Sequence, residues 1–210
     1  MKKVQMILMT KSYKDGGYCA TGIDVSTGDW IRLVSNEQGE PIKYAVLDRY
    51  PCKNCLDVLE VELLEHVPVS CQTENYLIDS NKVIKKVGSV TLNKLLTEEY
   101  LSSEPYIFGN TSRYLSDYKL NLFNHSLQFV IVQDLNVFAF VDDNDKIKNR
   151  CSFNYKGNAY NDISLTDPDY RHGGEYNIIY NSAAIIVSVP NKPYENGLAY
   201  KFVAKVFPLN

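Results

Sequence analysis

Four residues in the first half of the chain have the types and order of a zinc site. Cys52 and Cys55 form a C-x2-C pair, and His66 and Cys71 follow; thiolate and imidazole groups are the usual ligands of structural zinc. The spacing argues against such a site, because residues 56–67 alternate like a strand and eleven extended steps separate their ends by roughly 36 Å. We therefore expect loop cysteines, and keep the metal site as an alternative that requires a sharp bend.

The remaining motifs predict no catalytic centre. The chain has 3 histidines and no G-x-S-x-G nucleophile elbow. No predicted helix follows Gly16-Gly17 to complete a phosphate cradle, and the acidic run from Asp142 to Asp145 lacks the glycine and glutamate of a calcium loop. We therefore predict no catalytic residue and no cofactor, and turn to residues that bind.

A short basic stripe lies in the second half of the chain. Lys146, Lys148 and Arg150 alternate, so an extended strand places all three on one face, where they would meet a phosphate backbone. Phe153 and Tyr155 follow in the opposite phase, and nucleic-acid bases stack on such rings. A half-buried strand, with its rings inside and its charges outside, explains both sets of residues as well.

Trp30 and Arg32 form a second candidate binding pair. They are two residues apart, so one face of a strand presents a ring for stacking beside a cation. The alternative is that Arg32 pairs with Asp24 across a hairpin. The loop around Gly28 sets that register, and a bulge there would change it.

Charge and cysteine content restrict the partners and the compartment. The net charge is −3, and residues 1–105 carry 12 basic and 15 acidic side chains against 10 and 10 in residues 106–210. Any nucleic-acid site is therefore a local patch. The 5 cysteines, an odd number, indicate free thiols in a reducing compartment and predict a cytoplasmic protein. The apolar run near the N-terminus is too short for a signal peptide, and no stretch approaches a membrane span.

Alternating apolar residues predict strands over most of the chain. Residues 18–25 and 30–35 flank a turn-forming tetrapeptide, which predicts a hairpin, and residues 56–67 have one wet and one dry face. Three leucines and a tyrosine form a helical stripe that predicts one helix over residues 91–101. Strands return after residue 127. The predicted fold class is therefore mostly β, with closed or sandwiched barrels, in which the 16 tyrosines fit half-buried strands.

A series of short segments spans nearly the whole chain: Thr10-Lys11-Ser12, Cys19-Ala20 with Gly22-Ile23-Asp24, Trp30-Ile31-Arg32, Leu56-Asp57-Val58, Gln72-Thr73-Glu74-Asn75, Ser164-Leu165-Thr166-Asp167-Pro168 and Tyr200-Lys201-Phe202-Val203-Ala204. In this order they resemble the dual OB-containing domain family of bacteria. The resemblance implies two tandem OB-like small β-barrels. The helical region of the sequence sets their bounds, with barrels at residues 1–88 and 127–210 and a helical connection over 89–126; one compact unit is the alternative. It also implies a role in nucleic-acid-linked processes, including defence against phage, and brings no catalytic residues with it.

The segments of the resemblance single out Lys11, Arg32, Glu74, Asn75 and Asp167. Lys11 and Arg32 would meet phosphate. Glu74 and Asn75 would read a base or nucleotide edge, or cap a turn. Asp167, before a proline, is either a contact or the start of a helix.

These observations lead to three hypotheses. The first is a non-enzymatic double barrel that binds single-stranded nucleic acid or a nucleotide through aromatic platforms and a few cations. The second is a protein-interaction module of a larger assembly, whose acidic surface meets a basic protein partner. The third is a metal-dependent nucleic-acid hydrolase that acts through carboxylates such as Glu74 and Asp167.

Overall fold

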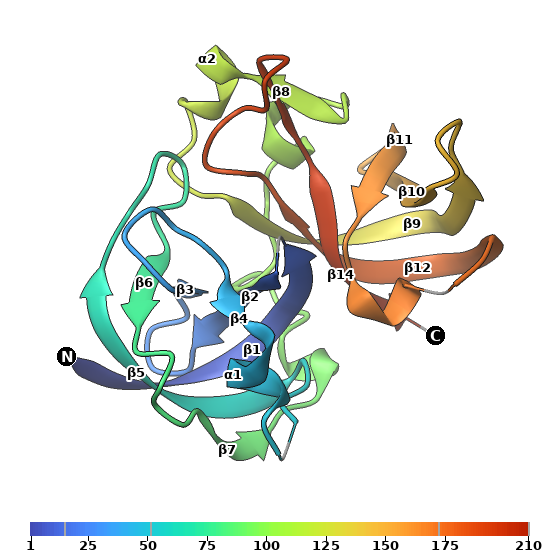
Figure 1. The fold of residues 1–210 in the computed structure, drawn as a ribbon. Helices are drawn as coiled ribbons and strands as arrows, with labels where there is room; N and C mark the ends of the chain where they lie inside the picture. Colours follow the sequence, from blue (N-terminus) through green and yellow to red (C-terminus); the bar gives the residue numbers. More distant parts are fainter. Residues whose placement is uncertain (15, 51, 172, 210) are drawn as a thin grey trace.

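A computed structural model describes residues 1–14, 16–50, 52–171 and 173–209. Figure 1 shows two β-barrels side by side, with a small lobe of α2 and β8 above them. The protein is mostly β, as the alternation of apolar residues predicts. Among the described residues, no helix has the length and apolar character needed to cross a membrane.

The first barrel closes through five strands. These are β1 (Lys2–Lys14), β2 (Gly17–Asp24), β3 (Trp30–Val34), β5 (Asp57–His66) and β6 (Asn75–Ile78). The pairings run β1–β2–β3–β6–β5, and β5 returns to β1. The predicted hairpin and the predicted strand over 56–67 are confirmed as β2–β3 and β5. Beside the ring lie β4 (Ile42–Lys43), α1 (Tyr44–Asp48) and β7 (Lys85–Ser89).

The second barrel repeats this topology. Its strands are β9 (Leu127–Val141), β10 (Ile147–Tyr155), β11 (Asn158–Leu165), β12 (Tyr176–Ser188) and β14 (Phe202–Leu209), and they close in the order β10–β11–β14–β12–β9. In both barrels the third strand pairs in parallel with the last strand, as β3 with β6 and β11 with β14, and the other described pairs of each ring are antiparallel. A five-stranded barrel with this connectivity is the OB fold.

The segment that links the barrels differs from the prediction of one helix over residues 91–101. It contains only a 3-10 turn, η1 (Leu92–Lys94). Val90 donates its amide to Leu56 beside the first barrel, and Ser102 donates to Phe129 of the second. The segment is thus held at both ends, and these tertiary bonds override its helical periodicity. The predicted stripe nevertheless packs between the barrels, where Leu95 is buried and Leu92, Leu96 and Tyr100 are half-buried.

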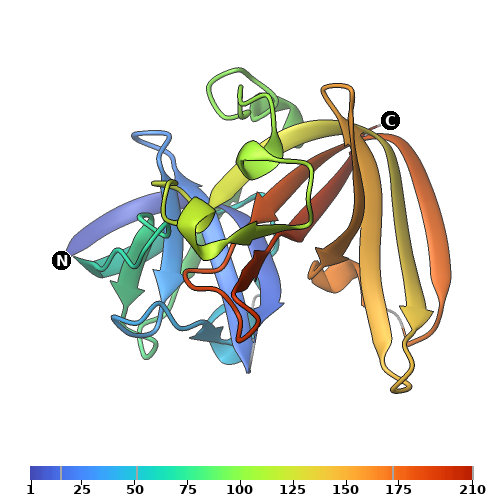
Figure 2. The ribbon, with the colours of Figure 1, turned by 90° about the horizontal axis from the view of Figure 1, so that it is seen from above.

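Short elements complete the chain. They are η2 (Ile107–Gly109), β8 (Tyr114–Ser116), α2 (Asp117–Leu120), η3 (Pro168–Tyr170) and β13 (Leu198–Tyr200). β8 and β13 pair antiparallel and form a two-stranded sheet outside both barrels, next to α2 (Figure 2). The assignment of separate domains to 1–88, 89–126 and 127–210 stays a prediction.

An apolar seam joins the two barrels. Met6 and Leu8 of β1 point into the first barrel, whereas Ile7 and Met9 point outward and pack with Phe129 and other apolar residues of the second barrel. Burial on both faces explains why this strand reads as a continuous apolar run. Apolar side chains of the two barrels therefore form one shared interface. A site at the margin of this interface contains residues of both barrels.

Candidate binding site between the barrels

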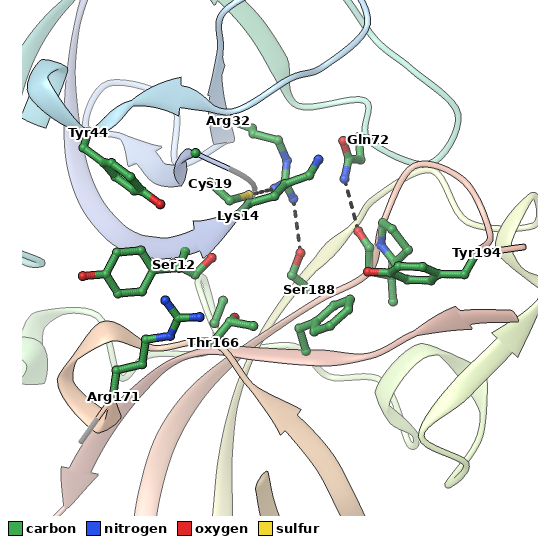
Figure 3. Close-up of a pocket in the computed structure, with 16 residues that line it drawn as sticks. Ser12, Lys14, Cys19, Arg32, Tyr44, Gln72, Thr166, Arg171, Ser188 and Tyr194 are labelled. Atoms are coloured by element: carbon green, nitrogen blue, oxygen red, sulfur yellow. Dashed lines mark hydrogen bonds between the residues drawn. The ribbon is translucent and has the colours of Figure 1, made fainter. Parts of the chain in front are cut away.

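A pocket of about 440 Å³ opens at the margin of the seam and is called the seam pocket here. Such a volume accommodates a small organic ligand. Both barrels contribute to its lining, which includes the cations Lys14, Arg32 and Arg171 and the rings Tyr13, Tyr44, Tyr194 and Phe202. Figure 3 shows Gln72 and Tyr194 at one end of the pocket and Tyr44 and Arg171 at the other.

The segments that carry the family resemblance converge on this pocket. They lie far apart in the chain, yet most of them supply a lining residue: Ser12, Cys19, Arg32, Gln72, Thr166, Phe202 and Ala204. Several of them lie in or next to the parallel strand pairs β3–β6 and β11–β14: Arg32 is in β3, Thr166 follows β11, and Phe202 and Ala204 are in β14. Ligands of OB folds bind to exposed strands and loops of the barrel, so the position is suitable for a binding site.

The electrostatic character of the seam pocket is positive. The described lining residues include no carboxylate. Neither Lys14 nor Arg171 forms an ion pair with any residue that the structure describes. The Arg171 guanidinium lies 4.5 Å from the centroid of the Tyr13 ring, a cation–π distance. Two cations without an acidic partner among the described residues thus border the pocket.

Arg32 lies in the wall of the pocket and ties the barrels together. Its side chain donates to Glu74 Oε1 at 3.0–3.1 Å and to Ser126 Oγ at 2.7 Å. Ser126 precedes β9, so this buried network crosses the seam. Burial alone would lower the pKa of Arg32, but the adjacent Cys19 and Glu74 hold it above its usual range. The alternative pairing of Arg32 with Asp24 is wrong, because Asp24 accepts from Ser26 and pairs with Lys2.

Glu74 and Asn75 are buried behind the pocket rather than open to it. Glu74 is 7% exposed and is engaged by Arg32 and Ser126. Asn75 is 0% exposed, and its side-chain amide has no hydrogen-bond partner within the described residues. Gln72 lines the seam pocket itself and donates to the Val189 carbonyl at 3.2 Å, again across the seam. The segment from 72 to 75 therefore fixes the relative position of the barrels.

Lys11 and Asp167 meet in a second pocket, also of about 440 Å³. Asp167 accepts from the Asp169 amide and begins η3, as the sequence Asp-Pro predicts. It also pairs with Lys205 at 3.2 Å. Burial raises the pKa of Asp167, whereas the neighbouring carboxylates hold the pKa of Lys205 above its usual range against the effect of its burial. Lys11 pairs with Asp48 at 3.5 Å.

The basic stripe and its rings follow the ordinary alternation of a half-buried strand. Tyr155 is 3% exposed in the core of the second barrel and donates to the Glu104 carbonyl at 2.7 Å, so it presents no face to a base. Lys148 pairs with Asp142 and Arg150 with Asp162. Trp30 is half-buried and packs against the apolar seam, so its pairing with Arg32 as a binding platform stays a prediction.

The four residues of the zinc alternative do not converge. Among the described residues no three His, Cys, Asp or Glu side chains are grouped as metal ligands. His66 bonds to the Thr73 carbonyl at 2.6 Å and stacks on Tyr76. Cys71 donates to the Pro190 carbonyl at 3.5 Å, and Cys55 lines the second pocket. Glu74 and Asp167, the carboxylates of the hydrolase hypothesis, likewise sit in separate networks.

Reasoning from the sequence missed four members of the seam pocket, Lys14, Tyr44, Arg171 and Tyr194. Lys14 ends β1, Tyr44 begins α1, Arg171 follows η3 and Tyr194 lies in the connection between β12 and β13. A weak signal was present in Ser12-Tyr13-Lys14, where polar and aromatic residues continue directly from a family segment. Arg171 and Tyr194 carry no such signal, because only the packing of the barrels brings them to the pocket.

Two closed five-stranded barrels with one shared topology define a tandem OB-fold binding module. The family model for the dual OB-containing domain matches residues 4–206, and the chain belongs to that family. No curated protein and no solved structure matches the chain.

Proposed function

We propose that the seam pocket binds a nucleotide unit, either free or within single-stranded nucleic acid. The observation that carries the proposal is the charge of the lining: Lys14 and Arg171 have no acidic partner and no carboxylate lines the pocket among the described residues, in a chain with a net charge of −3. Local positive charge in an acidic protein marks a place where an anion is bound. OB folds bind oligonucleotides as one of their common ligands.

Phosphate would be held by Lys14 and Arg171. Both are free of carboxylate partners within the described chain, so a phosphate does not have to displace an existing ion pair. Arg171 also presents a planar guanidinium, which matches two phosphate oxygens at once. Arg32 stabilises the wall of the pocket and is not expected to bind phosphate, because its donors bond to Glu74 and Ser126.

The base would pack against the tyrosines. Tyr13, Tyr18 and Tyr44 form one cluster with ring centroids 4.8–5.7 Å apart, and Tyr194 stands at the opposite end of the pocket (Figure 3). Stacking on such rings is tolerant of base identity. The proposal therefore predicts weak sequence preference and strong dependence on the phosphate.

Fluorescence anisotropy with labelled single-stranded DNA and RNA tests the proposal directly. Lys14→Ala and Arg171→Ala should each weaken binding by about 10-fold or more, because each removes a charge-assisted contact of about 1.5–3 kcal/mol. Each should also reduce the slope of log K against log salt by about 0.7. Competition by free nucleotides measures the affinity of the single unit.

Lys85→Ala is the matched control, since Lys85 is an exposed cation on β7, remote from the pocket lining. It should leave the affinity and its salt slope unchanged. Equal losses in Lys85→Ala and Arg171→Ala would show diffuse attraction instead of a site. Absence of binding at tens of micromolar protein, where non-specific contacts are already seen, contradicts the proposal.

One observation favours the second candidate, a protein-interaction module. Strand β7 pairs with β5 alone among the described strands, and all five of its residues are exposed. An open strand edge is a template for an added strand from a partner. This function is favoured if a partner protein co-purifies stably with the wild type and not with Val87→Pro, and if the wild type has no affinity for nucleic acid.

A further inference from the structure

Three tyrosine rings lead away from the seam pocket across the sheet of β8 and β13. Tyr194 lines the pocket, and its ring centroid lies 5.7 Å from that of Tyr200. Tyr200 lies 6.0 Å from Tyr114, its cross-strand partner in the register of β13 and β8. The rings are continuous with the pocket, and they are named here the tyrosine track.

The track is unusually open for aromatic side chains. Tyr194 is 52% exposed and Tyr114 is 39% exposed. The rings meet at 67° and 72°, so they do not lie flat on one another as a closed stack would. Exposed rings in a row forgo much of the burial that normally stabilises tyrosine. They suit a ligand that brings flat rings of its own.

The tyrosine track is held in place rather than left loose. Asn191 Nδ2 donates to the Gln38 carbonyl of the first barrel at 3.3 Å, and Asn196 Nδ2 donates to the Tyr200 hydroxyl at 2.9 Å. The Arg113 guanidinium lies 5.9 Å from the Tyr200 ring centroid and pairs with Asp162. Because these contacts already order the aromatic surface and the cation beside it, little further conformational entropy is lost when a ligand binds.

We propose that the ligand is a single strand of nucleic acid rather than a mononucleotide, and that the bases next to the one in the seam pocket stack on the tyrosine track. This inference rests on the proposed function and deepens it, because it assigns the class of ligand and the direction in which the strand leaves the pocket. The track belongs to neither barrel, so it extends the binding surface beyond the OB folds. Stacking on successive rings adds affinity for each further base.

The test compares ligands of increasing length on the intact protein. A labelled homopolymer of about ten nucleotides, a dinucleotide and the mononucleotide are titrated by anisotropy or competition at one salt concentration. The wild-type affinity should rise with length. Tyr114→Leu should lose about 5- to 100-fold for the ten-mer, which corresponds to one stacked base, and should bind the mononucleotide as the wild type does.

Leucine at position 114 keeps an apolar side chain against Tyr200 across the strands, so the small sheet should persist. Tyr114→Trp retains a flat ring and should keep the affinity for the ten-mer. Tyr50→Ala removes a tyrosine that is 94% exposed on the first barrel and serves as the matched control. It should change nothing.

Two outcomes overturn the inference. If the mononucleotide binds and Tyr114→Leu binds the ten-mer as tightly as the wild type, the track is a structural pair and only this inference is wrong. If neither the mononucleotide nor the ten-mer binds the wild type, the proposed function fails and the inference falls with it. Arg171→Ala separates the two, since it should weaken both ligands.

Discussion

The seam pocket and the second pocket enclose the same volume, about 440 Å³ each, and they draw on adjacent residues of the same segments. Thr166 lines the first and Asp167 the second; Ala204 lines the first and Lys205 the second. Successive side chains of an extended chain point to opposite sides, so the two pockets are the two sides of one junction. Their chemistry is nevertheless opposite.

In the second pocket every cation has an acidic partner. Lys205 pairs with Asp167 and Asp169, and Lys11 pairs with Asp48. In the seam pocket Lys14 and Arg171 have none among the described residues. Each of these ion pairs lies within one barrel, so it stabilises the barrel that carries it, whereas unmatched cations at the surface are available to an anion from outside. The second pocket therefore has a structural role, and the unmatched charge of the seam pocket supports the proposed binding.

The largest expected effect is on stability, in the second pocket. Lys205→Met leaves the Asp167 carboxylate, whose side chain is 0% exposed, without its cation. Removal of one partner from a buried pair costs about 3–5 kcal/mol. Chemical denaturation should show this loss of unfolding free energy, while Lys14→Met in the seam pocket should change it by less than about 0.5 kcal/mol.

A second variant distinguishes loss of the ion pair from loss of packing. Lys205→Met combined with Asp167→Asn removes both charges and keeps an acceptor for the Val206 amide, which Asp167 binds at 2.9 Å. The double variant should recover part of the lost stability. If it is as unstable as Lys205→Met alone, the charges of the second pocket do not stabilise the second barrel.

The next effect concerns Lys201, a buried cation with no carboxylate partner in the part of the chain that the structure describes. It donates to the Ile107 carbonyl at 2.6 Å and to the Asn110 carbonyl at 2.7 Å. Burial, with a smaller contribution from Lys119, lowers the pKa of Lys201 to about 7. Burial disfavours the charged form of a lysine, whereas the unmatched cations Lys14 and Arg171 border an open pocket.

The sign of the pH effect follows from the lowered pKa. The unfolded lysine keeps its proton to about pH 10.4, so between pH 7 and that value the unfolded state binds more protons and stability rises with pH. The unfolding free energy of the wild type minus that of Lys201→Met should increase by about 2 kcal/mol from pH 7 to pH 9. A flat difference would mean that Lys201 titrates in the folded protein as it does in water.

Local patterns in the sequence predict much of the fold. The hairpin of β2 and β3, the alternation of β5 and the order of the family segments all predict elements that the structure contains. The helix over residues 91–101 was wrong because period alone does not distinguish a helix from turns pinned at both ends. Its apolar stripe still identified the buried side.

The site was harder to predict because it belongs to neither barrel alone. Arg32 and Asp167 were found, but as members of buried networks: Arg32 bonds to Ser126 across the junction, and Asp167 pairs with Lys205 within the second barrel. Lys14 and Arg171 were not predicted, because no feature of the sequence indicates that the margins of the two barrels are in contact. When residues come together only because one domain packs on another, no local periodicity in the sequence indicates their contact.

The smallest expected effect sharpens the comparison on the outer wall of the second barrel. Lys146 begins the basic stripe in the turn between β9 and β10 and is exposed. The stripe's other cations are neutralised by Asp142 and Asp162, so it lacks the unmatched charge that marks the seam pocket. Lys146→Ala should therefore change affinity for single-stranded nucleic acid less than about 2-fold, within the range of a screened surface charge. A loss equal to that of Arg171→Ala would place the strand along the stripe, and the seam pocket would then be a gap between two barrels rather than their shared site.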